Sequence, residues 1–215
     1  MDLSSLVQTA FEHYRAFNEA NPITGSILTA GVIFPSADIT SQLITDKTVH
    51  WRKVRYTTGL VPWYGAWAYV SVRSGDVVEA YISEQPLAKA ALGPNLIGPL
   101  FNLFFFLNNG VGEKSNYSLQ ALGRHYRSFF QKEKKDDTLT TIVQRKLLDY
   151  IPKKEYWNSF IGTLTFWNAF QYVNYSYIPQ ELQTPATLGV AFGWTVLLSL
   201  WSLGGGRKLI SNTQP

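Results

Sequence analysis

The sequence predicts an all-α protein: an integral membrane bundle of four to five spanning helices, formed by a single domain over residues 1–215. Hydrophobic residues make up 46% of the chain and charged residues only 16%, against roughly 25% in a typical soluble domain. The charges are also clustered, so that residues 156–206 contain only Glu181. A membrane helix needs about 20 predominantly apolar residues, which such stretches supply. A soluble protein with buried helices is the alternative.

Five stretches of low charge predict the individual spans. They lie at about 23–45, 56–72, 90–110, 157–178 and 185–203. The last span contains no charge and gives the strongest signal. The second has only 17 residues, which is at the lower limit for a membrane helix.

The basic residues between these spans alternate in number. Apart from Lys89, at the edge of the third span, the segments 1–22, 46–55, 73–86, 113–156, 179–184 and 204–215 contain one, four, one, ten, none and two Lys or Arg residues. Loops rich in Lys and Arg stay on the cytosolic or matrix side of a membrane. The alternation therefore predicts five spans, with the N-terminus on the less positive side and the C-terminus on the positive side. Because the basic residues are spread over several loops, the net charge of +4 indicates topology and no nucleic-acid partner.

Two segments outside the spans predict amphipathic helices. Residues 1–22 carry apolar side chains at helical spacing and end at Asn21-Pro22; this helix either lies on the membrane surface or docks onto the bundle. Residues 113–156 predict a charged extramembrane loop with two helices, around 119–130 and 139–151, separated by a solvated turn. Three consecutive glycines at 204–206 predict the end of the last helix.

Polar side chains within the predicted spans are the candidate functional residues. Asp38 is the one acidic residue of the first span, and Gln42 follows one helical turn later on the same face. A carboxylate near the centre of a membrane helix costs about 2.5 to 3.5 kcal/mol on insertion scales. We therefore expect Asp38 to face the bundle interior or water. It either lines a pore or makes a buried bond between helices, to Lys89 or to a tyrosine.

Two further polar stripes predict contacts between helices. Asn95 and Asn102 lie seven residues apart on the third span, and Gln171 and Asn174 follow Trp167 on the fourth. Such side chains hydrogen-bond neighbouring helices, at about 0.6 to 2 kcal/mol each, or line a transport path; the first role is favoured. The G-x-x-x-G spacing at 189–193 predicts close approach of another helix in the last span.

The sequence predicts no catalytic residue, no cofactor and no metal site. There is no cysteine, which excludes disulfides, thiolate ligands and a cysteine nucleophile. The three histidines share no metal-ligand spacing. Neither a phosphate-binding loop nor a serine-nucleophile motif is present. We therefore expect a protein without enzymatic activity.

The motifs resemble those of the Mpv-seventeen family, also called the twenty-two-kilodalton peroxisomal membrane protein family. The opening pattern of the family is matched by Asp38 and Gln42. The more specific pattern is carried by Trp167, Gln171, Asn174, Tyr175 and Pro179, with Trp194 in the last span. The usual proline after the tryptophan is Asn168 here, and the usual arginine four residues after the proline is Gln183. The chain therefore resembles a divergent member of the family.

The resemblance implies a small helical protein of the mitochondrial inner membrane or, alternatively, of the peroxisomal membrane. Members are usually described with four spans, whereas the charge pattern favours five. The association of the family with solute passage suggests a solute channel or its regulator. The second hypothesis is a non-catalytic accessory subunit of a larger membrane complex, such as a respiratory-chain assembly. The expected partners are the lipid bilayer and membrane proteins, in a homo-oligomer or a larger complex, with no cofactor.

Overall fold

The computed structural model describes residues 3–130 and 147–211, and the regular structure of these residues is helical, which confirms the predicted all-α class. The elements in chain order are α1 (Leu3–Ala20), α2 (Pro22–Thr45), α3 (Trp51–Gly59), α4 (Val61–Tyr81), α5 (Pro86–Lys114), α6 (Leu119–Phe130), the short 3-10 helix η1 (Leu148–Tyr150), α8 (Lys153–Gly162), the π-helical turn η2 (Thr163–Trp167), α9 (Asn168–Tyr177) and α10 (Gln180–Ser211).

Proline fixes the start of the two most apolar helices. Pro22 and Pro86 stand at the first positions of α2 and α5, where a missing N–H costs no intrahelical hydrogen bond. Asn21 separates α1 from α2, as the Asn-Pro pair predicts. The positions of these prolines therefore set where the long helices begin.

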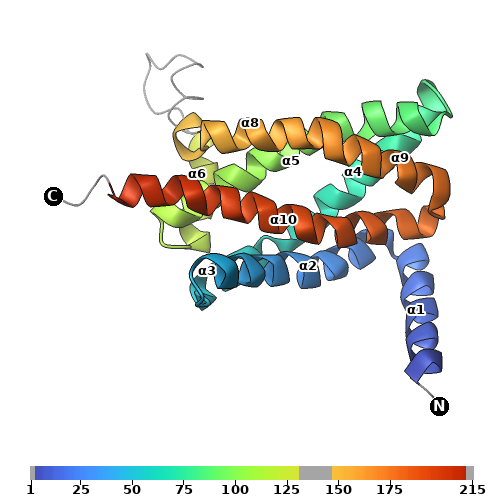
Figure 1. Cartoon of the computed structure of the whole chain (residues 1–215), viewed down its shortest axis with the longest axis horizontal. Coiled ribbons are helices and arrows are strands. Elements are labelled where there is room, and N and C mark those ends of the chain that lie inside the picture. Colours follow the sequence, from blue (N-terminus) through green and yellow to red (C-terminus); the bar gives the residue numbers. More distant parts are fainter. Residues whose placement is uncertain (1–2, 131–146, 212–215) are drawn as a thin grey trace.

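Five helical passes lie side by side and close into a ring (Figure 1). Helix α2 packs against α4, α4 against α5, and α5 against the segment from α8 to α9. That segment packs against α10, which returns to α2 and also touches α4. Successive passes run in opposite directions, so the N- and C-termini lie at opposite ends of the ring (Figure 1).

The two ends of the ring differ in charge. Helices α3 and α6 and the start of α8 lie at the end nearer the C-terminus, whereas α1 and the turns before α5 and α10 lie at the other end (Figure 1). The first, called the basic end, carries Lys47, Arg52, Arg55, Lys114, Arg124, Arg127, Lys153 and Lys154. The second, called the acidic end, carries Glu12, Glu19, Asp76, Glu79, Glu84 and Glu181.

Two helices of the described residues, α2 and α5, are long and apolar enough to cross a membrane. Their most apolar windows have mean hydropathies of 1.3 and 1.5, and only 33% and 41% of these windows is buried in the protein. The predicted count of four to five spans is not confirmed by this criterion. The predicted span at 56–72 falls across α3 and α4, the one at 157–178 is interrupted by η2, and the one at 185–203 lies within α10.

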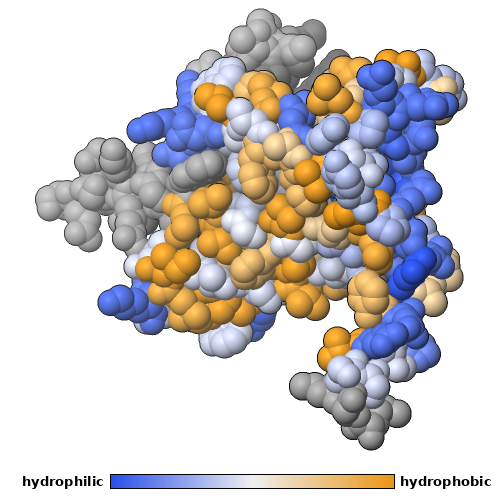
Figure 2. Space-filling model, turned by 45° about the vertical axis from the view of Figure 1, so that its right-hand side comes forward, coloured by the Kyte–Doolittle hydropathy of each residue, from blue (hydrophilic) through white to orange (hydrophobic). Residues whose placement is uncertain are grey.

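The outer surface carries many large apolar side chains. In Figure 2 an apolar area covers the middle of the visible face, and hydrophilic residues gather at its margins. Exposed examples come from different passes of the ring: Leu28 and Val32 on α2, Leu100 on α5, Ile161 on α8 and Leu197 on α10. The helices therefore present apolar side chains outward as well as inward.

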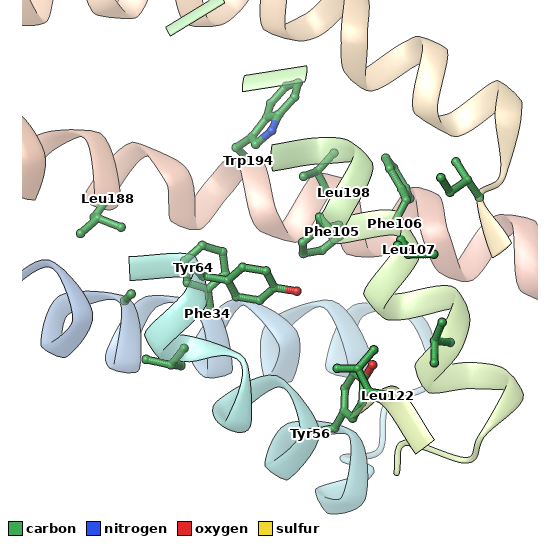
Figure 3. Packing of buried hydrophobic residues seen from close by; sticks show 14 residues of the cluster. Phe34, Tyr56, Tyr64, Phe105, Phe106, Leu107, Leu122, Leu188, Trp194 and Leu198 are labelled. Carbon is green, nitrogen blue, oxygen red and sulfur yellow. The ribbon is translucent and has the colours of Figure 1, made fainter. Parts of the chain in front are cut away.

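The interior of the ring is packed with aromatic and aliphatic side chains. Phe34 of α2 and Tyr64 of α4 have ring centroids 4.6 Å apart, and Phe105 of α5 lies beside Tyr64 at 6.1 Å (Figure 3). Leu188 and Leu198 of α10 complete this cluster and are fully buried. The core therefore joins four passes of the ring.

Several expectations about the last helix and the charged loop need correction or fall outside the described residues. Helix α10 continues to Ser211, so the glycines at 204–206 do not end it. A Cβ added at Gly189 or Gly193 would meet no described atom of a neighbouring helix within 4 Å, so within the described part of the chain this spacing brings no helix close. Helix α6 is the first of the two predicted loop helices. Most of the second, and the charged turn before it, lie outside the described residues.

Helices α4 and α5 approach each other closely at two glycines. A Cβ added at Gly93 would lie 2.8 Å from the backbone nitrogen of Gly75 and 3.0 Å from its Cα. The two backbones touch at this point, which is the arrangement that small residues permit in helix pairs. A larger side chain at Gly93 has to push the two helices apart.

We expect Gly93→Ala to lower the free energy of unfolding by about 1 to 3 kcal/mol, the range for overpacking a tight interior. The measurement is denaturant unfolding of the purified protein in a mild detergent, followed by circular dichroism. Gly189→Ala is the matched control, because the added methyl group meets open space. Equal stability of the two variants would contradict a tight α4–α5 contact.

Candidate functional site

Asp38 is buried in the second half of α2, with 3% of the residue exposed. Its Oδ1 lies 3.0 Å from Nζ of Lys53 on α3, and both side chains are 4% exposed. Its Oδ2 accepts hydrogen bonds from Gln42 Nε2 at 3.1 Å and from Thr57 Oγ1 at 3.2 Å. The carboxylate is therefore paired and hydrogen-bonded, as a buried charge requires.

Gln42 extends this cluster to the connection between α2 and α3. Its Oε1 accepts a hydrogen bond of 2.6 Å from the backbone N–H of His50, the residue that precedes α3. Because its Nε2 donates to Asp38, the one amide group links α2 to the start of α3. The cluster therefore fixes how α3 lies against α2.

The partner of Asp38 differs from the expected ones. Lys89 lies at the acidic end, where it pairs with Glu79 and stands 5.1 Å from the ring centroid of Tyr175. Lys53 is counted from the sequence as an exposed loop charge, whereas it is 3% exposed. Nothing in the sequence distinguishes Lys53 from its exposed neighbours Arg52 and Arg55.

Asn95 and Asn102 face the segment from α8 to α9. Asn102 Nδ2 donates to Thr163 Oγ1 at 2.9 Å and to the carbonyl oxygen of Ser159 at 3.4 Å. Asn95 Nδ2 donates to Asn168 Oδ1 at 2.7 Å. The two asparagines thus bond across one helix interface. Asn168, where the family usually has proline, supplies a partner that proline could not.

Gln171 and Asn174 form a second cluster, between α9 and α10. Asn174 Nδ2 lies 2.9 Å from Gln171 Oε1 and 3.2 Å from Thr187 Oγ1, and it also reaches the carbonyl oxygen of Gln183 at 3.4 Å. Gln171 Nε2 donates to the same threonine at 3.3 Å. Gln171 and Asn174 are at most 1% exposed, so this cluster ties α9 to α10 within the interior.

The other residues of the family pattern pack around this cluster. Trp167 meets Trp194 of α10 edge to face, with ring centroids 6.0 Å apart. Tyr175 donates a hydrogen bond of 2.8 Å to the carbonyl oxygen of Val72 on α4. Pro179 lies between the end of α9 and the start of α10. The pattern therefore marks the contacts of α9 with α10 and α4.

A cavity of about 70 Å³ lies inside the ring. A site of about 10 to 15 Å³ in the same measure holds one water molecule, so this cavity has room for several. Each pass of the ring contributes to its lining, for example Phe34 of α2, Trp67 of α4, Asn102 of α5, Thr163 of η2, Gln171 of α9 and Thr195 of α10. The described residues that line it include no charged side chain.

Two polar groups of this central cavity have no protein partner among the described residues. They are the indole N–H of Trp67 and the hydroxyl of Thr195, and both atoms are buried. An indole N–H only donates, whereas a hydroxyl both donates and accepts. Buried polar groups need a partner, so these two groups favour water or the oxygen of a small neutral molecule in the cavity.

A smaller second cavity of about 10 Å³ adjoins the central one toward Asp38. Phe34 and Thr195 line both cavities, whereas Asp38, Thr57 and Asn109 line only the second. The phenyl ring of Phe34 is 1% exposed and lies where the two cavities meet. The interior therefore contains two adjoining cavities, and the ring of Phe34 lines both of them.

The predicted polar residues are thus only partly brought together. Asn102 and Gln171 line the central cavity and Asp38 lines the second, whereas Gln42, Asn95 and Asn174 line neither. The residues that sequence reasoning missed are hydroxyl side chains, above all Thr163 and Thr195. Threonine is common in apolar helices, so its spacing gives little signal. The π-helical turn that begins at Thr163 is a feature found often at functional sites.

The basic end contains a further polar contact without a predicted role. Tyr126 of α6 donates a hydrogen bond of 2.6 Å to Asn108 Oδ1, and Tyr56 donates one of 2.6 Å to the carbonyl oxygen of the same asparagine. Burial raises the pKa of Tyr126 to about 12. Tyr126 therefore keeps its proton at neutral pH and holds α6 against α5.

The described residues contain no group of three or more His, Asp or Glu side chains that could hold a metal ion. The arrangement found in them is a closed helix ring with polar contacts between helices and an uncharged central cavity. This defines an all-helical protein with two helices long and apolar enough to cross a membrane.

Comparison with known proteins agrees with this class. Residues 152–199 match the Mpv17 / PMP22 family, which confirms the resemblance predicted from the sequence and supports a membrane protein of that family. The matched segment includes Trp167, Gln171, Asn174, Tyr175 and Pro179. An uncharacterised protein of Schizosaccharomyces pombe, C4G9.14, is 25% identical over 204 residues, which cover 92% of this chain and 75% of that protein. This low identity is consistent with a divergent member. No solved structure matches the chain.

We expect removal of one member of the buried ion pair to destabilise the protein strongly. Lys53→Met leaves the Asp38 carboxylate without its cation, which costs about 3 to 5 kcal/mol for a buried pair. The double variant Lys53→Met with Asp38→Asn should recover much of this loss. The measurement is denaturant unfolding in detergent.

The control for this prediction is the more exposed pair Arg73–Asp76, whose atoms lie 3.0 Å apart. Asp76→Asn should cost at most about 1 kcal/mol, because solvent screens such pairs. Additive losses in the double variant at Asp38 and Lys53 would contradict a direct interaction.

Proposed function

We propose that the protein is a membrane channel for small neutral solutes, held closed in this structure by Phe34. The observation that carries the proposal is the uncharged cavity inside the ring, to which every helical pass contributes. Ligand and solute sites in helix bundles lie between the helices in the same way. We place the protein in the mitochondrial inner membrane, with the peroxisomal membrane as the alternative. The matching family includes proteins of both membranes.

The outer surface supports a membrane setting for the ring. The apolar windows of α2 and α5 are mostly unburied, whereas a core helix of a soluble protein would be mostly buried. The other three passes run beside these two helices. If α2 and α5 cross the bilayer, the remaining passes of the same ring lie in it as well.

The charges at the two ends support an orientation. Basic residues outnumber acidic ones at the basic end, which holds α3, α6 and the start of α8. The acidic end has the opposite balance, and its Arg15, Arg73 and Lys89 are each paired with an acidic side chain. By the positive-inside rule the basic end would face the matrix or cytosol.

The lining of the two cavities supports the choice of solute. The central cavity has no charged lining residue among those described, and an unpaired charge there would lose its hydration without compensation. Asp38, in the second cavity, is already neutralised by Lys53. Small neutral molecules with hydrogen-bonding oxygens suit this path best, because Trp67 and Thr195 have unused bonding capacity.

One observation favours the second candidate, a non-catalytic accessory subunit of a larger membrane complex. The Gln171–Asn174–Thr187 cluster and the Asn102–Thr163 contact hold helices together by bonding to one another. Polar groups engaged in this way act in packing and leave less of the interior for a solute. An accessory subunit needs helices that are held together in this way, and it does not need a passage for solutes.

We expect Phe34→Ala to raise solute flux, because it removes the ring shared by the two cavities. The protein is reconstituted into liposomes, and swelling in urea or glycerol is followed by light scattering. The expected result is a several-fold higher rate of swelling for Phe34→Ala than for the unmodified protein. The rate for Phe34→Leu should lie between these two. Potassium flux should stay at the level of protein-free liposomes.

The control for flux is Leu28→Ala, because this leucine is 58% exposed on the outer surface of α2 and lines neither cavity. It should leave the rate unchanged. Rates for Phe34→Ala that equal those of protein-free liposomes, from a protein with unchanged circular dichroism, would contradict the channel proposal.

The native mass in mild-detergent extracts of the source membranes separates the two candidate functions. A channel should migrate as a monomer of 24.3 kDa in its detergent micelle or as a small homo-oligomer. Stable migration with a heavy assembly would favour the accessory subunit instead. Fractionation of the organelles in the same experiment tests the proposed location.

A further inference from the structure

We infer that α1 is an interfacial helix that lies on the membrane surface at the acidic end, with the apolar side chains Leu6, Val7 and Phe11 in the lipid. The inference concerns the contact of this helix with the bilayer and is independent of solute passage. It follows from the direction of the helix, from its rotation about its own axis and from the side chains that it leaves uncovered.

The direction of α1 differs from that of the ring. Figure 1 shows α1 projecting from the end of the ring in a direction transverse to α2 and α10, with the N-terminus away from the bundle. If α2 runs along the membrane normal, α1 lies in the plane of the membrane. Asn21-Pro22 produces this bend, because α1 ends at Ala20 and α2 begins at Pro22.

A side-chain contact fixes the rotation of α1. The hydroxyl groups of Tyr14 on α1 and Thr29 on α2 lie 2.7 Å apart. Thr29 is seven residues into α2, or about 10 Å along its axis at 1.5 Å per residue. The face of α1 that carries Tyr14 is therefore turned toward the body of the ring and hence, in a membrane, toward the bilayer interior.

The apolar residues of α1 lie on this same face. Val7 and Phe11 precede Tyr14 by seven and three residues, which places all three on one side of a helix. Val7 is 61% exposed, and Leu6 and Phe11 are each 50% exposed. Side chains that are turned toward the bilayer interior and left half or more exposed by the described residues are positioned for lipid.

The polar face of α1 points the other way, and several of its side chains pair with one another. Gln8 donates to Glu12 at 3.2 Å, and Arg15 pairs with Glu19 at 3.2 Å. The Tyr14 contact therefore turns the apolar face of α1 toward the bilayer and its polar face toward water. Helices of this kind lie with the apolar face about 5 to 10 Å into the headgroup boundary.

The last turns of α1 hold the helix in this direction. Arg15 forms an ion pair with Glu181 at the start of α10, and Asn18 Nδ2 donates to the backbone carbonyl of the same residue at 3.2 Å. The apolar surface of α1 also continues onto α2, where Leu28 and Val32 beside Thr29 are 58% and 67% exposed. Lipid that covers α2 therefore also covers the apolar face of α1.

The chain lacks cysteine, so a single introduced cysteine gives one labelling site for a test on the full-length protein. Val7→Cys and Phe11→Cys report on the apolar face, and Gln8→Cys and Glu12→Cys are matched controls on the polar face. Each variant is labelled with an environment-sensitive fluorophore and reconstituted into liposomes of neutral phospholipid. Fluorescence is quenched with nitroxide-bearing lipid in one series and with iodide in the other.

We expect labels at 7 and 11 to be quenched several-fold more by the lipid-borne nitroxide than those at 8 and 12, and the iodide series to show the reverse. Labels at 7 and 11 that iodide reaches as readily as those at 8 and 12 would overturn the inference. Protection of 7 and 11 from both quenchers would overturn it as well, because it would indicate a protein partner, such as a second copy, in place of lipid. Circular dichroism of each labelled variant verifies that the helices are retained.

Discussion

A charge buried between helices has to be neutralised, and the Asp38–Lys53 pair meets this constraint at the junction of α2 and α3. An unpaired carboxylate within a helix bundle is costly, so the chain has to return toward α2 directly after α2 ends. Thr57 and Gln42 use the remaining capacity of the carboxylate. With α3 held in place, α4 begins beside α2 and the ring can close. The same cluster keeps Lys53 away from the solvent-exposed residues of the basic end.

The other polar residues of the interior act in the same way but without charge. Asn102 with Thr163 and Asn174 with Thr187 each join two passes of the ring. Among the described residues that line the central cavity, these bonds leave two buried groups unpaired, those of Trp67 and Thr195. The lining is therefore uncharged and contains two polar groups that are not yet paired, which suits a neutral molecule better than an ion.

The sequence predicted the helical class, the break at Asn21-Pro22 and the family resemblance because each rests on a local pattern. The charge pattern likewise matches the opposite charges at the two ends of the ring. It could not give the partner of Asp38, because Lys53 is close in sequence but becomes a partner only when α3 folds back. Nor could it reveal the hydroxyl groups of Thr163 and Thr195, because threonines in apolar helices are ordinary and only the cavity distinguishes these two. The three glycines at 204–206 supplied a helix-ending signal that α10 does not follow.

The π-helical turn η2 gives the segment from α8 to α9 an unusual geometry. A π turn accommodates one more residue than an α-helical turn, which offsets the faces before and after it by about 100° from ideal α-helical register. Ser159 thereby faces Asn102 of α5, while Gln171 and Asn174 face Thr187 of α10. The turn thus changes which side chains of each half reach α5 and α10, while both halves pack against both helices. If the π turn moved to a neighbouring position along the segment, the side chains between its old and new positions would rotate toward a different neighbour. Neither α8 nor α9 would have to unfold.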